Sequence, residues 1–376
     1  MFEFEEATKG AVIKVIGVGG AGGNAINNMI RSGIEGVEFI AANTDAQALS
    51  KNLASIKIQL GSNLTKGLGA GGNPEMGRKA AIEDTESISD VLKGADLIFI
   101  TAGMGGGTGT GAAPVIASIA KDLGALTVAV VSKPFYWEGK RRNEYADEGL
   151  QFLKEHVDTY IIVPNDKILD IIDKTTPFTE AFRIADDVLR QGTQGISDTI
   201  NSNGYINVDF ADIRTIMDSK GMALMGIGEA SGENRDKVAA HHALTSPLLA
   251  DVNIKGATGI LINITGGSDM TMYEIQNIAQ IVYENAGEDA VIFKGVVIDE
   301  SMVGKIRVTV VATGIGSVKK EKTIQIDDFV KKANPGTDAI IKKVKSIKGI
   351  EKGLRSLDDY DEEEMEIPTY LRKQVD

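Results

Sequence analysis

The chain has 376 residues, of which 43 % are hydrophobic and 25 % charged, values typical of a globular protein with room for two domains. Its formal net charge of −13 argues against general binding to nucleic acid or to anionic lipid. Cysteine is absent, which excludes disulfides and thiolate metal sites, and no apolar run is long enough to insert into a membrane, so we expect a cytoplasmic protein.

Residues 1–10 predict a short acidic tail, and a glycine-rich turn follows soon after it. Ile13–Ile16 predicts a strand, and Gly17–Asn24 then reads Gly-Val-Gly-Gly-Ala-Gly-Gly-Asn before a helical pattern. Its first, third and sixth residues fit G-x-G-x-x-G, which lets backbone N–H groups approach a phosphate at a helix N-terminus. This fingerprint is weak on its own.

Two further glycine runs lie in the same half of the chain. Lys66–Pro74 precedes a helical pattern, and Gly103–Gly111 holds six glycines in nine positions between a strand pattern and a helix pattern. A flexible surface turn is the alternative for Gly103–Gly111, but such a turn does not normally join a hydrophobic strand to a helix. Three such loops predict a site for a phosphate chain, although no P-loop motif occurs.

The first half alternates strand and helix patterns, which predicts βαβ units and a Rossmann-like parallel sheet over residues 11–176. The predicted strands are Ile13–Ile16, Glu38–Ala42, Leu97–Thr101, Thr127–Val131 and Tyr160–Pro164. In such sheets ligands bind beyond the carboxyl ends of the strands, where all three glycine loops fall.

The second half predicts a long central helix over residues 177–203 and a smaller α+β domain over 204–316 with four strands, for an α/β protein overall. Residues 317–366 predict a flexible, charged linker, and residues 367–376 a short apolar peptide that docks to a partner; a frayed terminus is the alternative.

Residues Gly103–Gly111 resemble the signature G-G-G-T-G-[ST]-G of the tubulin superfamily. Further motifs narrow the resemblance to the FtsZ family of bacterial cell-division GTPases. These motifs are Gly17–Asn24, Asn43–Asp45, Thr65–Asn73, Lys133–Arg142, Pro164–Lys167 and Asn207–Arg214, with Ile367–Lys373 similar to the family's partner-binding peptide. The resemblance covers nearly all of the chain from Ala11 to Ile315 and the final residues, but not the linker.

The resemblance implies a GTP/GDP site with Mg²⁺ in the first domain. Its phosphate-side residues would be Gly20, Ala21, Gly22, Gly23, Asn24, Asn43, Asp45, Ala70, Gly71, Gly72, Asn73, Gly103, Gly105, Gly106, Gly107, Thr108, Gly109, Thr110 and Gly111. Glu138 and Arg142, with Pro134, would meet the ribose and phosphates, and Asn165 the base. Phe182 would stack on guanine.

Asp186 is implied to accept hydrogen bonds from the N1–H and amine of guanine. A carboxylate can accept two parallel N–H bonds on that edge, whereas adenine offers no matching pair of donors. From the residues alone, a solvated position on the central helix is favoured for Asp186 and a core position for Phe182; only the resemblance reverses these preferences.

The resemblance also implies that Asn207, Asp209 and Asp212 act at the γ-phosphate of the next subunit in a head-to-tail filament. Two carboxylates can orient water and help to hold a cation. Helix capping is the alternative, because Asp209 stands where an N-cap would stand and Asp212 where a capping-box acid would stand.

The expected function is therefore a self-assembling GTPase that scaffolds division at mid-cell and binds membrane-tether and other division proteins through Ile367–Lys373. A cytoskeletal relative outside division and a nicotinamide-dependent oxidoreductase stay open as alternatives. The terminal peptide weighs against the first, and the glycine run at Gly103–Gly111 against the second.

Overall fold

The computed structural model describes residues 10–201, 208–218, 221–249, 254–287 and 290–315, which belong to one compact unit. Asn207, residues 1–9 of the predicted tail and the segments 317–366 and 367–376 lie outside the described residues. None of the described helices is long and apolar enough to cross a membrane.

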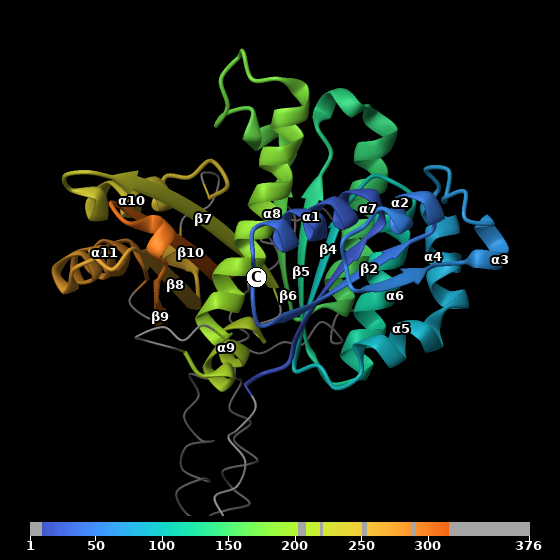
Figure 1. The fold of residues 1–376 in the computed structure, drawn as a ribbon, viewed down its shortest axis with the longest axis horizontal. Helices are drawn as coiled ribbons and strands as arrows, with labels where there is room; N and C mark the ends of the chain where they lie inside the picture. The colour runs from blue at the N-terminus through green and yellow to red at the C-terminus, as the bar shows by residue number, and fades with distance from the viewer. Residues whose placement is uncertain (1–9, 202–207, 219–220, 250–253, 288–289, 316–376) are drawn as a thin grey trace, which may run out of the picture. The chain divides into compact units, whose positions relative to one another are not determined.

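A ten-stranded sheet, in the order β3-β2-β1-β4-β5-β6-β7-β10-β8-β9, organises this unit (Figure 1). Strands β1 to β6 are all parallel to their neighbours, while β10 is antiparallel to both β7 and β8. The strands are β1 (Ile13–Val18), β2 (Val37–Asn43), β3 (Ile56–Gln59), β4 (Leu97–Gly103), β5 (Leu126–Lys133), β6 (Thr159–Pro164), β7 (Gly221–Ser231), β8 (Gly259–Gly266), β9 (Val291–Ile298) and β10 (Lys305–Ile315).

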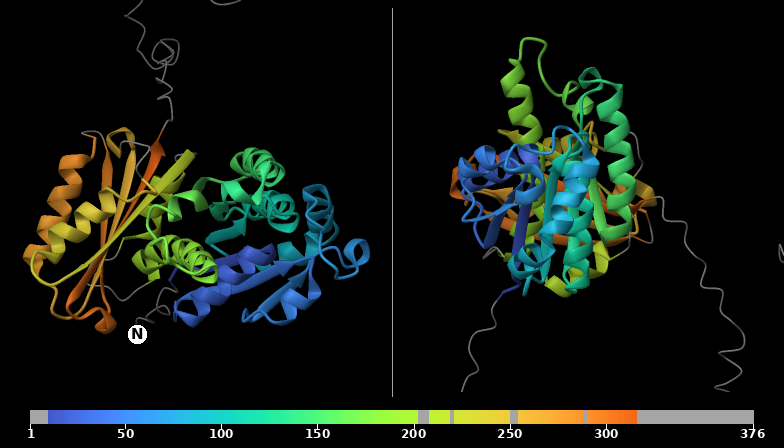
Figure 2. Two further views of the ribbon diagram at one scale, coloured as in Figure 1. Left: turned by 90° about the horizontal axis from the view of Figure 1, so that it is seen from above. Right: turned by 90° about the vertical axis from the view of Figure 1, so that its right-hand side faces the viewer.

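Helices connect these strands and cover both faces of the parallel part of the sheet (Figure 2). The α-helices are α1 (Gly19–Arg31), α2 (Ala46–Ser50), α3 (Ser62–Thr65), α4 (Pro74–Glu83), α5 (Thr85–Leu92), α6 (Thr108–Asp122), α7 (Lys140–His156), α8 (Phe178–Asn201), α9 (Phe210–Met217), α10 (Arg235–Leu244) and α11 (Met272–Asn285). Four short 3₁₀ turns are η1 (Tyr136–Glu138), η2 (Asn165–Ile168), η3 (Ile254–Gly256) and η4 (Glu300–Met302).

The strand pattern explains why helices lie on both faces. Alternate residues of one strand belong to different core clusters, so Ile98 and Ile100 pack toward α4 to α7, whereas Leu97 and Phe99 pack toward α1, α8 and α9. A strand buried on both sides reads as a continuous apolar run, as β4 does. A third cluster lies between α10, α11 and the strands β7 to β10.

Parallel pairing brings the carboxyl ends of β1 to β6 to one edge of the sheet. The turns that begin at Val18, Asn43, Gly103, Lys133 and Pro164 therefore start at this same edge. The predicted fold class, a Rossmann-like parallel sheet with a long central helix and a smaller α+β part, is confirmed.

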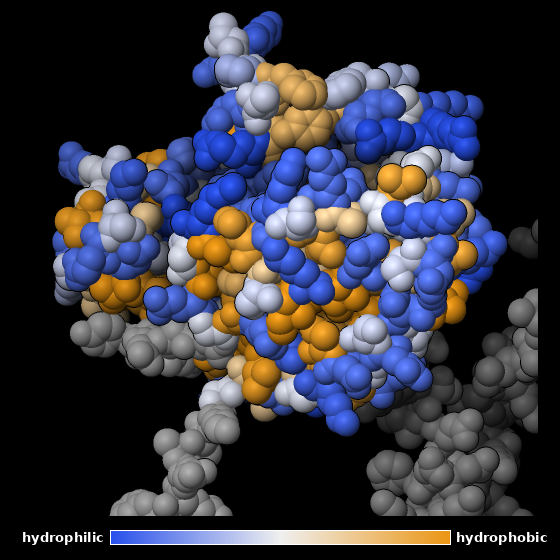
Figure 3. Space-filling model, turned by 45° about the vertical axis from the view of Figure 1, so that its right-hand side comes forward, coloured by the Kyte–Doolittle hydropathy of each residue, from blue (hydrophilic) through white to orange (hydrophobic). Residues whose placement is uncertain are grey.

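Two features differ from the sequence prediction. Strand β3 was not predicted, because its four residues are too short for a clear alternation. The four strands of the second half, β7 to β10, continue the first sheet because β6 and β7 pair in parallel at Thr159 to Ile161. On the face seen in Figure 3, hydrophobic side chains gather in a central area between hydrophilic ones.

Candidate active site

The first and last glycine loops pack directly on each other at the carboxyl edge of the sheet. A Cβ added to Gly19 would lie 2.9 Å from the amide nitrogen of Gly109, and one added to Gly103 would lie 2.6 Å from Cβ of Ala21. Real Cβ atoms do not approach other atoms so closely, so only glycine lets these loops meet. Gly19 also has a φ of +74°, in the left-handed region.

The loop before α4 closes on the same centre. A Cβ on Gly107 would lie 2.8 Å from Cβ of Ala70 and 2.9 Å from the Asn73 nitrogen, and one on Gly111 would lie 1.9 Å from the Pro74 oxygen. The predicted convergence of three glycine loops is therefore present in the structure. Helix α4 is held against α6 by the same contacts.

Four other glycines in these loops face open space. A Cβ built on Gly20, Gly71, Gly72 or Gly106 would meet no atom within 4 Å. The glycines thus divide into those that let backbones pack and those that leave backbone bare toward open space. Bare backbone N–H groups next to the N-termini of α1 and α6 form an arrangement suited to a phosphate chain.

The predicted ribose-side residues also lie together. A Cβ on Gly105 would lie 2.7 Å from the Arg142 oxygen and 3.1 Å from Cγ of Pro134. Arg142 Nη1 lies 2.6 Å from Glu138 Oε2, and Glu138 Oε1 accepts a hydrogen bond from the Phe135 amide at 2.9 Å. Glu138 therefore fixes both the turn at η1 and the position of the Arg142 guanidinium.

Several polar side chains predicted to touch the nucleotide hold the loops in shape. The Asp45 carboxylate caps α2 by accepting from the Gln47 and Ala48 amides. Asn73 Oδ1 accepts from the Glu75 amide and caps α4. Similar roles fall to Asn43, which accepts from the Asp45 amide, and to Thr110, which accepts from the Gly105 amide at 2.8 Å.

A small cavity of about 110 Å³ lies beside the first loop, between α1, the end of β2 and α2. Gly20, Gly23, Asn24 and Asn43 are among the residues that line it. Gly22 instead packs into the sheet, since its Cβ would lie 2.4 Å from the Thr101 oxygen. The first loop therefore presents only part of its length to a ligand.

The predicted base-side residues carry polar groups that the protein leaves unpartnered, as in Asn165, or disfavours by burial, as in Asp186. Asn165 is 6 % exposed, and its Oδ1 has no hydrogen-bond partner in the structure. Asp186 is half-buried, and burial raises the pKa of its carboxyl group to about 7. A buried acceptor without a donor is costly, so a ligand with N–H groups would relieve both sites.

Phe182 belongs to an aromatic cluster that sequence reasoning missed. Its ring centroid lies 5.4 Å from that of Phe135 and 4.8 Å from that of Phe178, and Trp137 stacks on Phe135 at 5.7 Å. These four residues help to line a cavity of about 400 Å³. Phe135 and Trp137 stand in a motif quoted above, but periodicity alone gives no signal for their meeting Phe182.

Asp209 and Asp212 lie at the other end of the molecule. The Arg214 guanidinium, one turn further along α9, donates to the Gly124 oxygen, just beyond the end of α6. Because Thr108 starts α6, the fifteen residues of this helix, about 22 Å, separate the phosphate loops from α9. Figure 1 shows α9 at the lower end of α8, the central helix.

The capping explanation for these two acids receives little support. Asp209 occupies the N-cap position of α9, but its side chain makes no capping hydrogen bond. Asp209 is exposed and Asp212 half-buried. The two carboxylates therefore stand at the surface without a capping role in the described residues.

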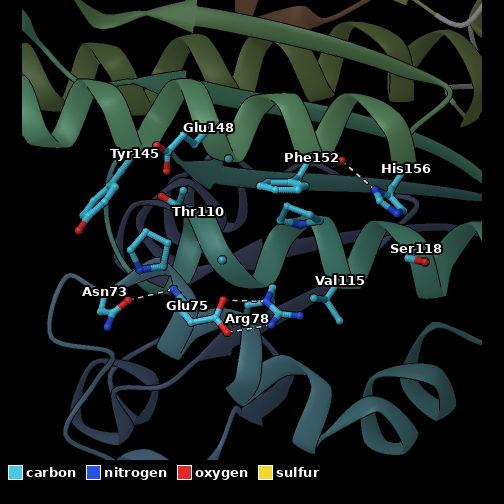
Figure 4. Close-up of a pocket in the computed structure, with 14 residues that line it drawn as sticks. Asn73, Glu75, Arg78, Thr110, Val115, Ser118, Tyr145, Glu148, Phe152 and His156 are labelled. Atoms are coloured by element: carbon cyan, nitrogen blue, oxygen red, sulfur yellow. Dashed lines mark hydrogen bonds and ion pairs between the residues drawn. The ribbon is translucent and has the colours of Figure 1, made fainter.

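A cavity of about 810 Å³, which was not predicted, lies over α6 between α4 and α7 (Figure 4). Only Asn73, Thr110 and Gly111 of its lining belong to the predicted site. Glu75 and Arg78 form a two-bonded ion pair beside it, at 2.8 and 2.9 Å. The cavity begins at Thr110 and Gly111, the last residues of the third glycine run, and extends along α6 and α7.

Comparison with known proteins identifies both halves of the chain. Residues 12–173 match the model of the Tubulin/FtsZ family, GTPase domain, and residues 221–316 match the FtsZ family, C-terminal domain. The chain is 54 % identical over 329 residues to the cell division protein FtsZ of Pseudomonas aeruginosa and, equally, of Azotobacter vinelandii. Each alignment covers 87 % of this chain and 83 % of the relative.

Solved structures agree with these matches. An empty FtsZ dimer from M. jannaschii is 47 % identical, with a TM-score of 0.80 over 83 % of this chain and 90 % of that one. A GTPγS-bound protofilament of CetZ2 from Haloferax volcanii is 20 % identical, with a TM-score of 0.68 over 89 % of this chain and 100 % of that one; it shares the fold.

Proposed function

This chain belongs to the FtsZ family and is a tubulin-like cell-division GTPase, and we propose that it hydrolyses GTP between head-to-tail subunits of its own filament. The oxidoreductase alternative is not favoured, because the Gly17–Gly22 turn lies inside the matched GTPase domain. The non-dividing cytoskeletal alternative is not favoured either, because the chain is 54 % identical to curated cell division proteins over 87 % of its length.

The convergence of three glycine loops around bare backbone carries the proposal. We assign the phosphate chain to the open side of Gly20, Gly71, Gly72 and Gly106, where backbone N–H groups can donate to phosphate oxygens. Thr108 is half-buried at the first turn of α6 and adds a hydroxyl donor. Mg²⁺ would bind chiefly to phosphate oxygens and water, which it prefers to an all-protein cage, and would neutralise their charge.

Guanine is assigned to the side of the site formed by Asn165, Phe182 and Asp186. The unpartnered Asn165 Oδ1 and the Asp186 carboxylate are acceptors, which suits the N1–H and amine donors of guanine. Phe182 supplies a ring for stacking once the base lies against it. Burial disfavours the ionised form of Asp186, and hydrogen bonds from these donors would offset that effect by stabilising the carboxylate.

Catalysis in trans follows from the separation of the two ends. Asp209 and Asp212 belong to the end of the molecule that α6 holds about 22 Å from Thr108. An aspartate side chain is far shorter than this distance, so neither acid reaches the phosphate loops of its own subunit. A second subunit stacked on the carboxyl edge can present its α9 there. We propose that Asp212, with Asp209 and Asn207, orients the attacking water.

Exposed apolar side chains support such stacking. Leu68, Tyr136 and Phe178 are 85, 83 and 65 % exposed and stand in segments that border the predicted nucleotide. Met272 and Tyr273, at the start of α11, are 71 and 80 % exposed. Large apolar side chains left at the surface favour burial between subunits, and an open head-to-tail contact produces filaments.

The decisive experiment replaces Asp212 by alanine. We expect GTP binding and filaments to persist, while turnover falls by about a hundredfold or more, the effect of losing a group that acts on the attacking water. Asp218→Ala is the matched control, because Asp218 is exposed at the other end of the same helix. Normal turnover by Asp212→Ala would overturn the catalytic role.

A mixing experiment tests whether Asp212 acts across the interface. A Thr108→Trp variant, designed to block the phosphate loops, should be nearly inactive alone, as should Asp212→Ala. Mixed filaments contain contacts with one intact GTP site and one intact Asp212, so GTPase activity should partly return. Co-assembly of the two variants, checked by sedimentation, with no return of activity would contradict action in trans.

We also propose that Ile367–Lys373 binds division and membrane-tether proteins and that the filament works at mid-cell. The supporting feature is an apolar, aromatic peptide after the acidic run Asp358–Glu366. Removing residues 367–376 should leave GTP hydrolysis and assembly within about twofold of the parent while abolishing recruitment to mid-cell. Unchanged recruitment in cells would contradict the assignment.

A further inference from the structure

Thr44, which follows β2 and is fully buried, joins the loops of the nucleotide site to one another. Its Oγ1 lies 2.7 Å from Oγ1 of Thr108 at the start of α6. Its backbone oxygen accepts hydrogen bonds from the Gly69 amide at 3.2 Å and from the Thr65 hydroxyl at 3.3 Å. One residue therefore contacts both the phosphate loop before α6 and the loop before α4.

The backbone around Thr44 pairs with the loop that leads to Ala70. Asp45 and Leu68 form an antiparallel bridge, and the Ala46 amide donates to the Gly67 oxygen at 3.0 Å. The same loop then continues to Ala70 and Asn73, which pack on Gly107. These contacts form a closed circuit from Thr44 through 67–73 to Gly107 and Thr108, and back to Thr44.

Burial decides how the two hydroxyl groups share their protons. Thr44 Oγ1 has Thr108 as its described hydrogen-bond partner, and a buried hydroxyl that donates to nothing is costly. The favoured arrangement has Thr44 donating to Thr108 Oγ1. The Thr108 proton is then left to point out of the loop, where Thr108 is only half-buried.

We propose that Thr44 is a positioning residue that orients the Thr108 hydroxyl as a donor to the nucleotide phosphates. This inference rests on the guanine-nucleotide site of the proposed function. The side chain of Thr44 would act only through Thr108, whereas its backbone oxygen anchors the 67–73 loop and is unaffected by side-chain substitution. Thr44→Val removes the hydroxyl and keeps the volume of the side chain.

A double-mutant cycle separates this role from a general structural one. The affinity of fluorescent mant-GDP is measured for the parent, Thr44→Val, Thr108→Val and the double variant, with GDP chosen because it is not hydrolysed. Loss of one neutral hydrogen bond corresponds to about a three- to tenfold weaker affinity, so we expect that effect from Thr44→Val in the parent. In the Thr108→Val background the same change should have less than about a twofold effect.

Thr44→Ser, which keeps the hydroxyl, should bind mant-GDP within about twofold of the parent. Equal losses in both backgrounds, or no loss in the parent background, would overturn the proposal. The thermal unfolding midpoint reports whether valine at position 44 disturbs packing. If it does, Thr44→Ala replaces Thr44→Val in the double-mutant cycle. A parent protein that fails to bind mant-GDP would instead overturn the proposed function itself.

Discussion

The two sides of the proposed nucleotide site are built in different ways. The phosphate side consists of backbone, held in place by glycines at which an added Cβ would lie within 3 Å of neighbouring atoms. The base side consists of side chains, and two of these, Asn165 and Asp186, carry polar groups that the protein leaves unmet or penalised. The backbone donors of the phosphate side are thus in place before a ligand binds, whereas the acceptors of the base side obtain their donors from the ligand.

This difference separates affinity from selectivity. Preformed backbone donors bind any polyphosphate, because every nucleoside triphosphate presents the same oxygens. An unpartnered acceptor strengthens the binding only of a base that has donors at the matching position. A base without such donors leaves the acceptor buried and unpaired, which weakens its binding. The choice of guanine therefore depends on a few side chains, which substitutions can remove one at a time.

The largest effect is expected on the phosphate side. Gly111→Ala places a Cβ 1.9 Å from the Pro74 oxygen, so α4 must move away from α6. Such overpacking against backbone should cost about 3 kcal/mol of unfolding free energy and also weaken nucleotide binding. Calorimetric unfolding checks the first effect and mant-GTP titration the second.

Gly106→Ala is the matched control, because its Cβ would meet no atom within 4 Å. Its unfolding midpoint should stay within about 2 °C of the parent, since nothing in the protein is displaced. Its nucleotide affinity should nevertheless fall, because the new methyl group faces the proposed phosphates. A lower unfolding midpoint with unchanged nucleotide binding would contradict the assignment of Gly106 to the glycines that face the ligand rather than to those that let backbones pack.

On the base side, Asp186→Ala should weaken GTP binding by about 1.5–3 kcal/mol, the range for hydrogen bonds to a charged group. Binding of ATP, measured by competition with mant-GTP, should change little, because adenine lacks the matching donors. The parent should strongly prefer GTP. Equal turnover of ATP and GTP by the parent would refute the guanine assignment.

A smaller effect is expected from pH. With a pKa near 7, Asp186 is mostly ionised at pH 8 and about one-tenth ionised at pH 6, so GTP should bind about tenfold more weakly at pH 6. Asp186→Asn should lose this part of the dependence, which distinguishes it from protonation of the nucleotide. A parallel pH profile in both proteins would contradict the role of Asp186.

The same group affects stability with the opposite sign from an acid whose pKa is lowered by an ion pair in the folded state. Its pKa in the folded protein lies above the usual value of 3.8, so the folded state holds the proton more tightly. Stability of the nucleotide-free protein therefore falls as pH rises from about 4 toward 7. Asp186→Asn should raise the unfolding midpoint at pH 8 and leave it unchanged near pH 4.

The division between backbone and side chains also explains what could be predicted from the sequence. Glycine runs between strand and helix patterns are local signals, so the sequence predicts where each of the three loops lies. The partners of Phe182 were not predicted, because Phe135 and Trp137 reach it only after β5 and α8 are placed side by side. Thr44 gave no local signal of its contact with Thr108, 64 residues away.

The sheet shows the same limit. Apolar runs identified β1, β2, β4, β5 and β6, whose side chains pack against core clusters on both faces of the sheet. The single sheet was not predicted, because the pairing of β6 with β7 rests on three residue pairs that sequence periodicity does not encode. Long-range pairing is specified by packing on both faces of the two strands rather than by either strand alone.

The length of α6 gives the proposed filament a direction. One end of each stack exposes phosphate loops and the nucleotide they hold, without the acids of a neighbour; the other exposes α9 and its acids, without a nucleotide to act on. The subunit at the first end therefore keeps its GTP until the next subunit arrives. Under the proposed mechanism, a growing filament would carry an unhydrolysed cap at that end alone, and its two tips would gain and lose subunits at different rates.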